Sequence, residues 1–325
     1  MLAAGCGGDD EPTGPIPVDS KPLARGAYVK PLGAAVEAEH ALEDDAYRWR
    51  LITGFTSITI ENAMKWDQIE PEQGRFEFGE ADELIDFARR TGKRVRGHPL
   101  VWDEQLPEWL EEGDWTRAEL RQVVRDHIQA VARRYRGRLD EWDVVNEPLA
   151  DDGSLERNIF HRVIGPGWVE YAFRVANRVD PDAKLFLNEI GAEEPGPKSR
   201  ALLRLAGRLK QRGVPIDGIG FQHHTTGKDA PSRTRLRALF RAARGIGLEA
   251  AITEMDVGNT DAARQARVYA DAARVCATEP NCTGLTVWGV TDRWSWLGPE
   301  AGALVFDGDG KPKRALPALV RPLTR

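Results

Sequence analysis

The sequence lacks long apolar runs, clustered cysteines and an excess of positive charge. No stretch of its 325 residues approaches the roughly 18 apolar residues that a membrane-spanning helix needs, which argues against an integral membrane protein. Three cysteines without a CxxC pair exclude a zinc-cluster scaffold. The 45 basic and 51 acidic residues are spread along the chain, and at a net charge of −6 they form no basic stripe for nucleic acid.

The composition that remains is that of an ordinary globular protein, with 41% hydrophobic and 30% charged residues. Ten tryptophans stand beside only five tyrosines. Tryptophan can fill a core, but its large flat ring also suits the apolar face of a sugar. The surplus is therefore a weak indication of carbohydrate binding.

The first six residues, MLAAGC, resemble the end of a bacterial lipoprotein signal, in which the cysteine receives lipid. The positively charged and apolar regions of such a signal are missing, so Cys6 is either a lipidation site or has no such role. Residues 7–22 are rich in Gly, Pro and Asp, which predicts a flexible tether. We expect residues 1–22 to hold a folded domain, residues 23–325, at the bacterial cell envelope, or the protein to be secreted.

The other two cysteines flank a short segment that contains Glu279-Pro280-Asn281. Cys276 and Cys282 are either two buried thiols or the ends of a small disulfide loop. A disulfide requires an oxidising compartment outside the cytoplasm. Since the start of the chain indicates the same compartment, the sequence favours the disulfide.

Short β-branched runs alternate with longer segments of helical period along the chain. The predicted strands are Arg25–Val29, Phe55–Ile60, Arg94–His98, Trp142–Asn146, Lys184–Asn188, Gly218–Gln222, Ala250–Glu254 and Gly284–Val290. The clearest predicted helices are Ala81–Thr91, Arg117–Tyr135, Val169–Val179, Ser199–Arg212 and Arg233–Arg244. This alternation predicts a single-domain (β/α)8 barrel. A doubly wound sheet is the alternative, but no strand–GxGxxG–helix unit supports a dinucleotide site.

Two glutamates follow predicted strands at the end of the barrel where active sites lie. Glu147 follows the fourth strand and Glu254 the seventh, so the two side chains can converge across the barrel. Either glutamate could instead simply pair with an arginine, but both follow apolar strands and have polar neighbours. Two carboxyl groups that flank one bond are the equipment of glycoside hydrolysis, and a separation of about 5–5.5 Å gives retention of configuration.

Several segments make the chain resemble glycoside hydrolase family 10, the endo-β-1,4-xylanase family, from about Leu23 to the C-terminus. The matching segments are Glu61–Asp67 (ENAMKWD), Gly97-His98 with Leu100–Trp102, Trp142–Glu147, Gly218–Gly220 with Gln222 and His224, Ile252–Glu254, and Val287–Asp292 with Ser295-Trp296. The Asn-Glu pair is shared across a larger clan of barrel glycosidases. The first and last segments are more particular to family 10.

The resemblance implies a role for each matching residue. Glu147 would be the general acid/base and Glu254 the nucleophile, while Asn146 would bind the sugar 2-hydroxyl. His224 would hydrogen-bond Glu254, with Asp256 orienting the histidine. Residues around the reacting sugar would be Gln222, His98, Trp102, Trp288 and Trp296. Residues that bind the next sugar toward the non-reducing end would be Glu61, Asn62, Lys65 and Gln105.

The resemblance also implies what the protein binds. We expect a monomer that hydrolyses xylan or a related β-glycan without a metal or cofactor, and exported relatives often carry a disulfide where Cys276 and Cys282 lie. The adjacent His223 and His224 do not form a metal pair, since neighbouring side chains on an extended chain point opposite ways. Two alternatives remain open: a glycosidase of the same clan acting on another β-linked glycan, and a lipid-anchored carbohydrate-binding barrel without activity.

Two positions depart from the family pattern. Asp103 stands where the family usually has a histidine, and a further acid there would raise the pKa of a nearby carboxyl group. Ile190 stands where the family usually has a tyrosine that stacks on the leaving-group sugar. The segment Glu189–Pro195 adds three glutamates, which predicts a more acidic rim on that side. We therefore expect a cleft that binds tightly on the non-reducing side and weakly on the leaving-group side.

Overall fold

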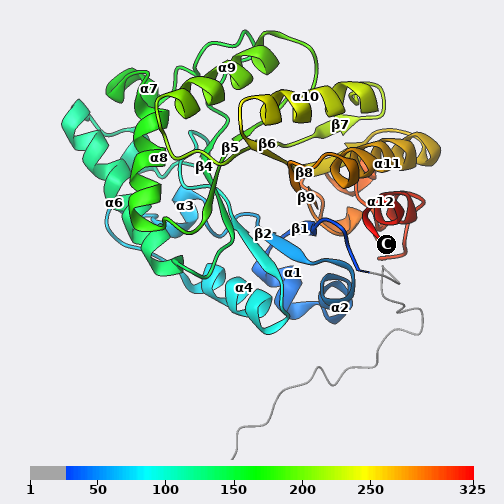
Figure 1. The fold of residues 1–325 in the computed structure, drawn as a ribbon. Helices are drawn as coiled ribbons and strands as arrows, with labels where there is room; N and C mark the ends of the chain where they lie inside the picture. Colours follow the sequence, from blue (N-terminus) through cyan, green and yellow to red (C-terminus); the bar gives the residue numbers. More distant parts are fainter. Residues whose placement is uncertain (1–26) are drawn as a thin grey trace, which may run out of the picture.

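Eight parallel strands close into a barrel in the computed structural model, which describes residues 27–325 (Figure 1). The predictions for residues 1–22, including Cys6, lie outside the described residues. The barrel closes because β6 pairs with β8 and β1 pairs with both β2 and β9. Its strands are β1 (Leu32–Val36), β2 (Ser57–Ile60), β3 (Arg94–Gly97), β4 (Glu141–Asn146), β5 (Lys184–Glu189), β6 (Gly218–Phe221), β8 (Glu249–Gly258) and β9 (Cys282–Val287).

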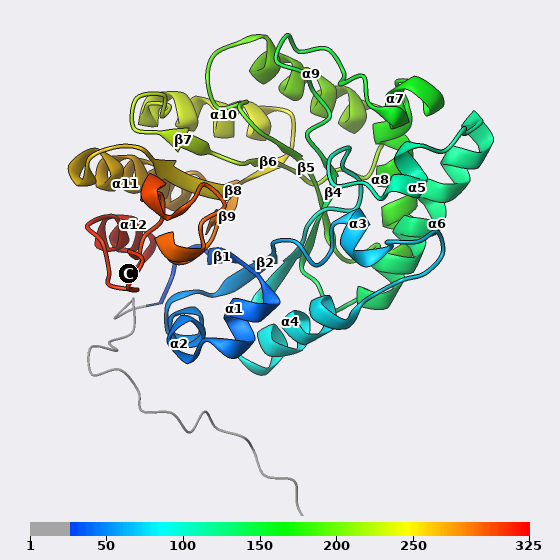
Figure 2. The same ribbon diagram turned by 180° about the vertical axis from the view of Figure 1, so that it is seen from behind.

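Helices surround the barrel in both views of the molecule (Figures 1 and 2). They are α1 (Ala38–Glu43), α2 (Asp45–Gly54), α3 (Trp66–Ile69), α4 (Gly79–Arg90), α5 (Glu108–Glu111), α6 (Arg117–Tyr135), α7 (Ile159–Ile164), α8 (Trp168–Val179), α9 (Pro197–Gln211), α10 (Arg233–Gly245), α11 (Ala262–Thr278) and α12 (Ala315–Leu323). The predicted (β/α)8 fold is therefore confirmed. Within residues 27–325, no helix combines the length and apolar character needed to cross a membrane.

The best predicted helix, α6, has a strong start signal. The Thr116 side chain accepts a hydrogen bond from the Glu119 backbone N–H, and the Glu119 carboxylate accepts one from the Thr116 N–H. This reciprocal capping box satisfies two donors that the first turn would otherwise leave unpaired. In α4, Leu84, Ile85 and Phe87 are buried against the barrel, as their spacing predicts.

The first strand is Leu32–Val36 rather than the predicted Arg25–Val29. Its residues, LGAAV, are mostly small and give a weak strand signal. The barrel requires small residues here, because a Cβ on Gly33 would lie 2.6 Å from Ser57 Oγ and 2.7 Å from Thr286 Oγ1. This strand therefore has small residues, which allow the neighbouring side chains to approach closely, instead of the usual β-branched residues.

The seventh barrel strand, β8, is longer than its neighbours and continues past the barrel rim. There it pairs with the short strand β7 (His224–Thr226), and His224 lies opposite Asp256 in the register. Because parallel partners in register bring their side chains together, this extension places an acid beside the histidine.

The predicted disulfide between Cys276 and Cys282 is present. It joins the last turn of α11 to the first residue of β9, and both cysteines are buried. The bond closes a loop with a sequence separation of six residues.

Opening this disulfide should destabilise the fold. Closing so short a loop in the unfolded chain accounts for about 2 kcal/mol of folding free energy. We expect protein refolded under reducing conditions to show a free energy of unfolding lower by that amount in urea titrations. The double variant Cys276→Ala/Cys282→Ala is the control, and its stability should not respond to reductant. Equal stability of the oxidised and reduced wild type would contradict this prediction.

Candidate active site

A cleft of about 660 Å³ opens at the carboxyl end of the barrel strands. It brings together all the residues proposed to act on or bind substrate, from elements spread over most of the chain. They are Glu61, Asn62, Lys65, His98, Trp102, Gln105, Asn146, Glu147, Gln222, His224, Glu254, Trp288 and Trp296. Asp256 lies directly behind His224, in an adjoining pocket.

Glu254 is held on β8 by one hydrogen-bond donor at each carboxylate oxygen. Asn188 Nδ2 donates to Oε1 at 2.6 Å, and His224 Nε2 lies 3.1 Å from Oε2. In addition, His98 Nδ1 lies 3.9 Å from Oε1. These donors fix the position of the buried Glu254 carboxyl group.

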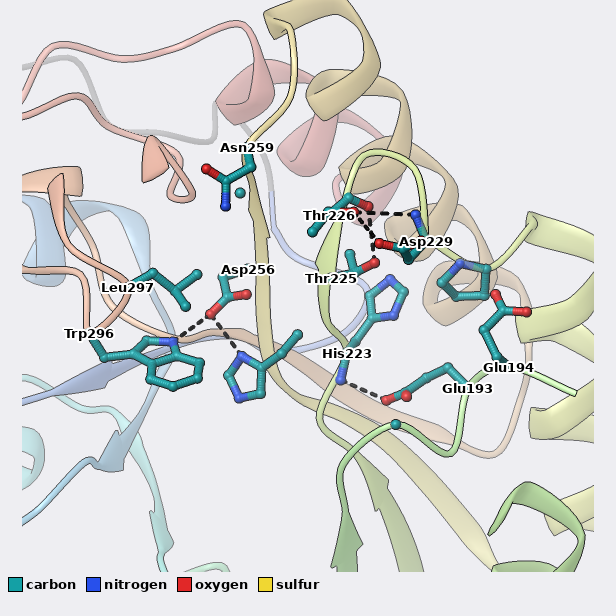
Figure 3. A pocket seen from close by; sticks show the side chains of 14 residues that line it. Glu193, Glu194, His223, Thr225, Thr226, Asp229, Asp256, Asn259, Trp296 and Leu297 are labelled. Atoms are coloured by element: carbon teal, nitrogen blue, oxygen red, sulfur yellow. Dashed lines mark hydrogen bonds and ion pairs between the residues drawn. The ribbon is translucent and has the colours of Figure 1, made fainter. Parts of the chain in front are cut away.

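His224 connects Glu254 to a second buried acid. Its Nδ1 lies 2.7 Å from Asp256 Oδ2, which also accepts a hydrogen bond of 2.8 Å from Trp296 Nε1 (Figure 3). Burial alone would lower the pKa of His224, but the hydrogen bonds to Asp256 and Glu254 outweigh it and raise the pKa to about 10. The ring is thus an imidazolium that donates from both nitrogens.

Glu147 has the opposite electrostatic environment. Burial raises its pKa, the hydrogen bond from Gln222 lowers it, and the negative charges of Glu254 and Glu104 raise it further. Its Oε1 accepts from Gln222 Nε2 at 2.7 Å and from Asn146 Nδ2 at 3.1 Å. The backbone at Glu147 has φ +51°, a strained conformation for a side chain of this size.

Asn188, at the end of β5, is a site residue that the sequence analysis did not assign. Its Nδ2 donates both to Asn146 Oδ1, at 2.8 Å, and to Glu254 Oε1. Its Oδ1 accepts from Thr253 Oγ1 at 2.7 Å. Gly220 makes room for this amide, since a Cβ there would lie 2.1 Å from Asn188 Oδ1. The only sequence signal was its place at a strand end.

A second unassigned group orients His98 from below the cleft. Asp143 on β4 lies 3.0 Å from His98 Nδ1 and accepts two hydrogen bonds from Arg96, one of them from Nε at 2.9 Å. All three residues are buried. Because Asp143 binds Nδ1, a buried carboxylate fixes the orientation of the His98 ring.

One end of the cleft carries the residues proposed for the second sugar. Lys65 Nζ donates to Asn62 Oδ1 at 2.7 Å and lies 5.2 Å from the centre of the Trp102 ring, while Asn62 Nδ2 donates to Glu37. Burial raises the pKa of Glu61 to about 8, with Glu37 adding to the effect. Gln105 lines the same end with φ +49°. These groups offer both donors and acceptors to hydroxyl groups.

Aromatic rings wall the rest of the cleft. Trp288 meets His98 edge-on, with ring centres 5.2 Å apart, and Trp296 is 55% exposed. Trp294, which the sequence analysis did not assign, is 37% exposed and stacks on His40 at 4.1 Å. Exposed tryptophans in a polar cleft offer flat faces to a ligand.

The adjoining pocket, shown in Figure 3, has a volume of about 370 Å³. Its floor is polar: the His223 backbone N–H donates to the buried Glu193 carboxylate at 2.6 Å. Within residues 27–325, no group of three or more His, Cys, Asp or Glu side chains is placed to hold a metal ion.

Of the two departures from the family pattern, one lines the cleft and the other does not. Ile190 does line the cleft, but Asp103 is not among its lining residues, whereas its neighbour Glu104 is. The rim after β5 is less acidic than predicted. Glu189 is buried and pairs with Lys198 at 3.3 Å, and Glu193 is buried as well, which leaves Glu194 exposed.

Comparisons with known proteins agree on one family. The model of glycosyl hydrolase family 10 matches residues 21–322. Endo-1,4-beta-xylanase B of Humicola insolens is 41% identical over 287 residues, which cover 83% of this chain and 78% of that enzyme. The structure of xylanase 10B from Thermotoga maritima superposes with a TM-score of 0.86 at 36% identity, covering 90% and 94% of the two chains. Xylanase 10B from Thermotoga petrophila, solved with xylobiose, gives 0.85 at 35% identity with the same coverage.

The electrostatics predict which neighbouring acid controls Glu147. Glu104→Gln removes a negative charge that raises the pKa of Glu147, so that pKa should fall. Glu108→Gln, which removes an exposed acid of α5 that does not line the cleft, is the control and should change it less. Carbon NMR titration of labelled glutamate side chains measures both. A larger shift in the Glu108 variant would contradict the assignment.

Proposed function

Because the chain belongs to glycosyl hydrolase family 10, we propose that it hydrolyses internal β-1,4-xylosidic bonds with retention of anomeric configuration. The observation that carries the proposal is the electrostatic contrast between two carboxyl groups in one cleft. Glu254 accepts a hydrogen bond at each oxygen, one of them from the His224 ring, while burial and neighbouring acids raise the pKa of Glu147. Relatives named endo-1,4-beta-xylanases support xylan as the polymer.

In the first step, a Glu254 oxygen attacks the anomeric carbon and the bond to the leaving-group oxygen breaks. Glu147 gives its proton to that oxygen, so the leaving sugar departs as an alcohol. Positive charge develops on the ring, and the buried Glu254 anion stabilises it electrostatically. The product is a glycosyl ester on Glu254 with Glu147 ionised.

In the second step, Glu147 takes a proton from water, whose oxygen attacks the anomeric carbon and breaks the ester bond. Two inversions at the same carbon give net retention. Asn146, which already donates to Glu147, has a second amide hydrogen for the sugar 2-hydroxyl. Asn188 holds Asn146 and Glu254 in one hydrogen-bonded unit, so it positions both.

The chemistry favours a protein that works outside the cytoplasm. We infer export of the catalytic domain, residues 23–325, because the Cys276–Cys282 disulfide is stable in an oxidising compartment. Attachment through lipid on Cys6 remains part of the proposal. Mass spectrometry of the mature N-terminal peptide tests it.

The two glutamates should respond differently to removal. Glu254→Ala should abolish turnover, because no other group can form the glycosyl ester. Glu147→Ala should still form the ester from substrates whose leaving groups need no proton, and azide should restore its turnover by replacing water. Kinetics with 2,4-dinitrophenyl β-xylobioside and xylan measure both effects. Inversion of configuration by the wild type, seen by proton NMR, would overturn the proposal.

The leaving-group side should bind weakly because Ile190 offers no flat ring. Ile190→Tyr should improve kcat/KM on linear xylan about fivefold, which corresponds to one aromatic contact of about 1 kcal/mol. Activity on an aryl β-xylobioside should change little, since its leaving group is not a sugar. Ile190→Leu is the matched control and should behave like the wild type. Unchanged xylan turnover in the tyrosine variant would show that another feature limits this side.

A further inference from the structure

We propose that a groove on the outer helical layer is a second polysaccharide-binding site, which takes a segment bearing carboxylate groups, such as a uronate-substituted chain. The groove lies between α6 and α8, has a volume of about 600 Å³, and is separate from the catalytic cleft. The choice of a polysaccharide as the ligand rests on the proposed function. We call it the arginine groove; its lining includes Arg121, Arg125, Arg174, Arg178 and Arg212.

The arginines form two stripes that face one another. Arg121 and Arg125 lie one turn apart on α6, and Arg174 and Arg178 lie one turn apart on α8. Arg212, which follows α9, lies at the same groove. Figure 2 shows α6 and α8 side by side at the outer edge of the molecule, as Figure 1 does from the other side. The arginines of α6, of α8 and of the end of α9 therefore meet at one groove of the outer layer.

The protein itself neutralises part of this charge. Glu170 is the one acid among the described lining residues, and it pairs with Arg174 at 3.0 Å and Arg212 at 2.9 Å, while Arg125 lies 3.8 Å from Asp126. Among residues 27–325, neither Arg121 nor Arg178 has a carboxylate within 4.0 Å. Like charges one turn apart destabilise a helix. An anion bound between the stripes would remove that repulsion.

A second cluster of arginines in this protein, by contrast, surrounds a carboxylate. Arg237, Arg241 and Arg244 on α10 all approach the buried carboxylate of Glu279, at 3.3, 3.2 and 3.7 Å. Those arginines have a structural partner, and they line neither the catalytic cleft nor the arginine groove. The arginine groove differs because it combines a cavity with two cations, Arg121 and Arg178, that have no such partner among residues 27–325.

Guanidinium groups and a tyrosine suit an acidic sugar. Arginine binds a carboxylate through two parallel hydrogen bonds, which favours uronate groups. Tyr171 adds an amphipathic ring whose hydroxyl donates to the Arg121 carbonyl at 2.7 Å and which lies 3.9 Å from the Arg121 guanidinium carbon. Gln122 completes the lining with an amide for hydroxyl groups.

The catalytic cleft does not share this excess of cations. The carboxyl groups of Glu37, Glu61, Glu104, Glu147 and Glu254 lie there beside Lys65, Arg293 and the His224 ring, and burial raises the pKa of Glu61 and of Glu147. A uronate group is therefore attracted to the arginine groove rather than to the cleft. A mixed polymer can then be held through an acidic stretch while a neutral stretch occupies the cleft.

The test compares two double variants with equal changes in charge. Arg121→Gln/Arg178→Gln removes two unpaired cations of the groove. Arg89→Gln/Arg133→Gln removes two exposed cations from α4 and α6 outside it. Both are made in a Glu254→Ala background, so that polymer is not cut, and retardation is measured by electrophoresis in gels with glucuronoxylan or neutral arabinoxylan. The same pairs in active enzyme are assayed on an aryl β-xylobioside.

The groove variant should bind glucuronoxylan about tenfold more weakly, as expected for two partly exposed ion pairs. Binding to arabinoxylan, and turnover of the aryl substrate, should stay at the wild-type level. Equal retardation of the two double variants would overturn the proposal. So would tighter binding of polyphosphate or anionic lipid vesicles than of glucuronoxylan. A wild type that binds glucuronoxylan but cuts neither the aryl substrate nor xylan would overturn the proposed function instead.

Discussion

Two carboxyl groups that share one cleft must hold opposite protonation states, and most of the site geometry serves this requirement. Left alone, two nearby carboxyl groups would each raise the pKa of the other. The protein breaks the symmetry with a protonated histidine on one side only. His224 reaches Glu254, and the fully buried Asp256 keeps the ring charged. Glu147 receives only neutral amide donors, so its proton is retained more readily.

The barrel supplies this asymmetry through strand lengths and register. The extension of β8 beyond the rim allows β7 to pair with it, which sets His224 opposite Asp256. Meanwhile β4, β5 and β8 bring Asn146, Asn188 and Glu254 to one level, and the amide of Asn188 joins them. Each functional side chain is fixed by a neighbour on another strand. Because the hydrogen-bonded strands are rigid, the site is rigid as well.

How much the sequence could predict depends on whether the signal was local. Helix α6 was predicted with both ends correct, since the capping box at Thr116 and Glu119 and the apolar spacing are local features. The first strand was misplaced because its small residues reflect contacts with Ser57 and Thr286, which are distant in sequence. Asn188 was missed for the same reason: its importance comes from partners on other strands.

Charge shows the limit of local inference most clearly. Three glutamates after β5 predicted an acidic rim, yet Glu189 and Glu193 are buried and their charges are met by Lys198 and by a backbone N–H. The number of charged residues can be read from the sequence, but only the fold determines which of them are exposed to solvent. The outer helices show the opposite case. Arginines that are far apart in the sequence line one groove there, and they outnumber the acids in its lining. The outer flank of the barrel therefore carries a basic groove that a count of charges along the chain would not reveal.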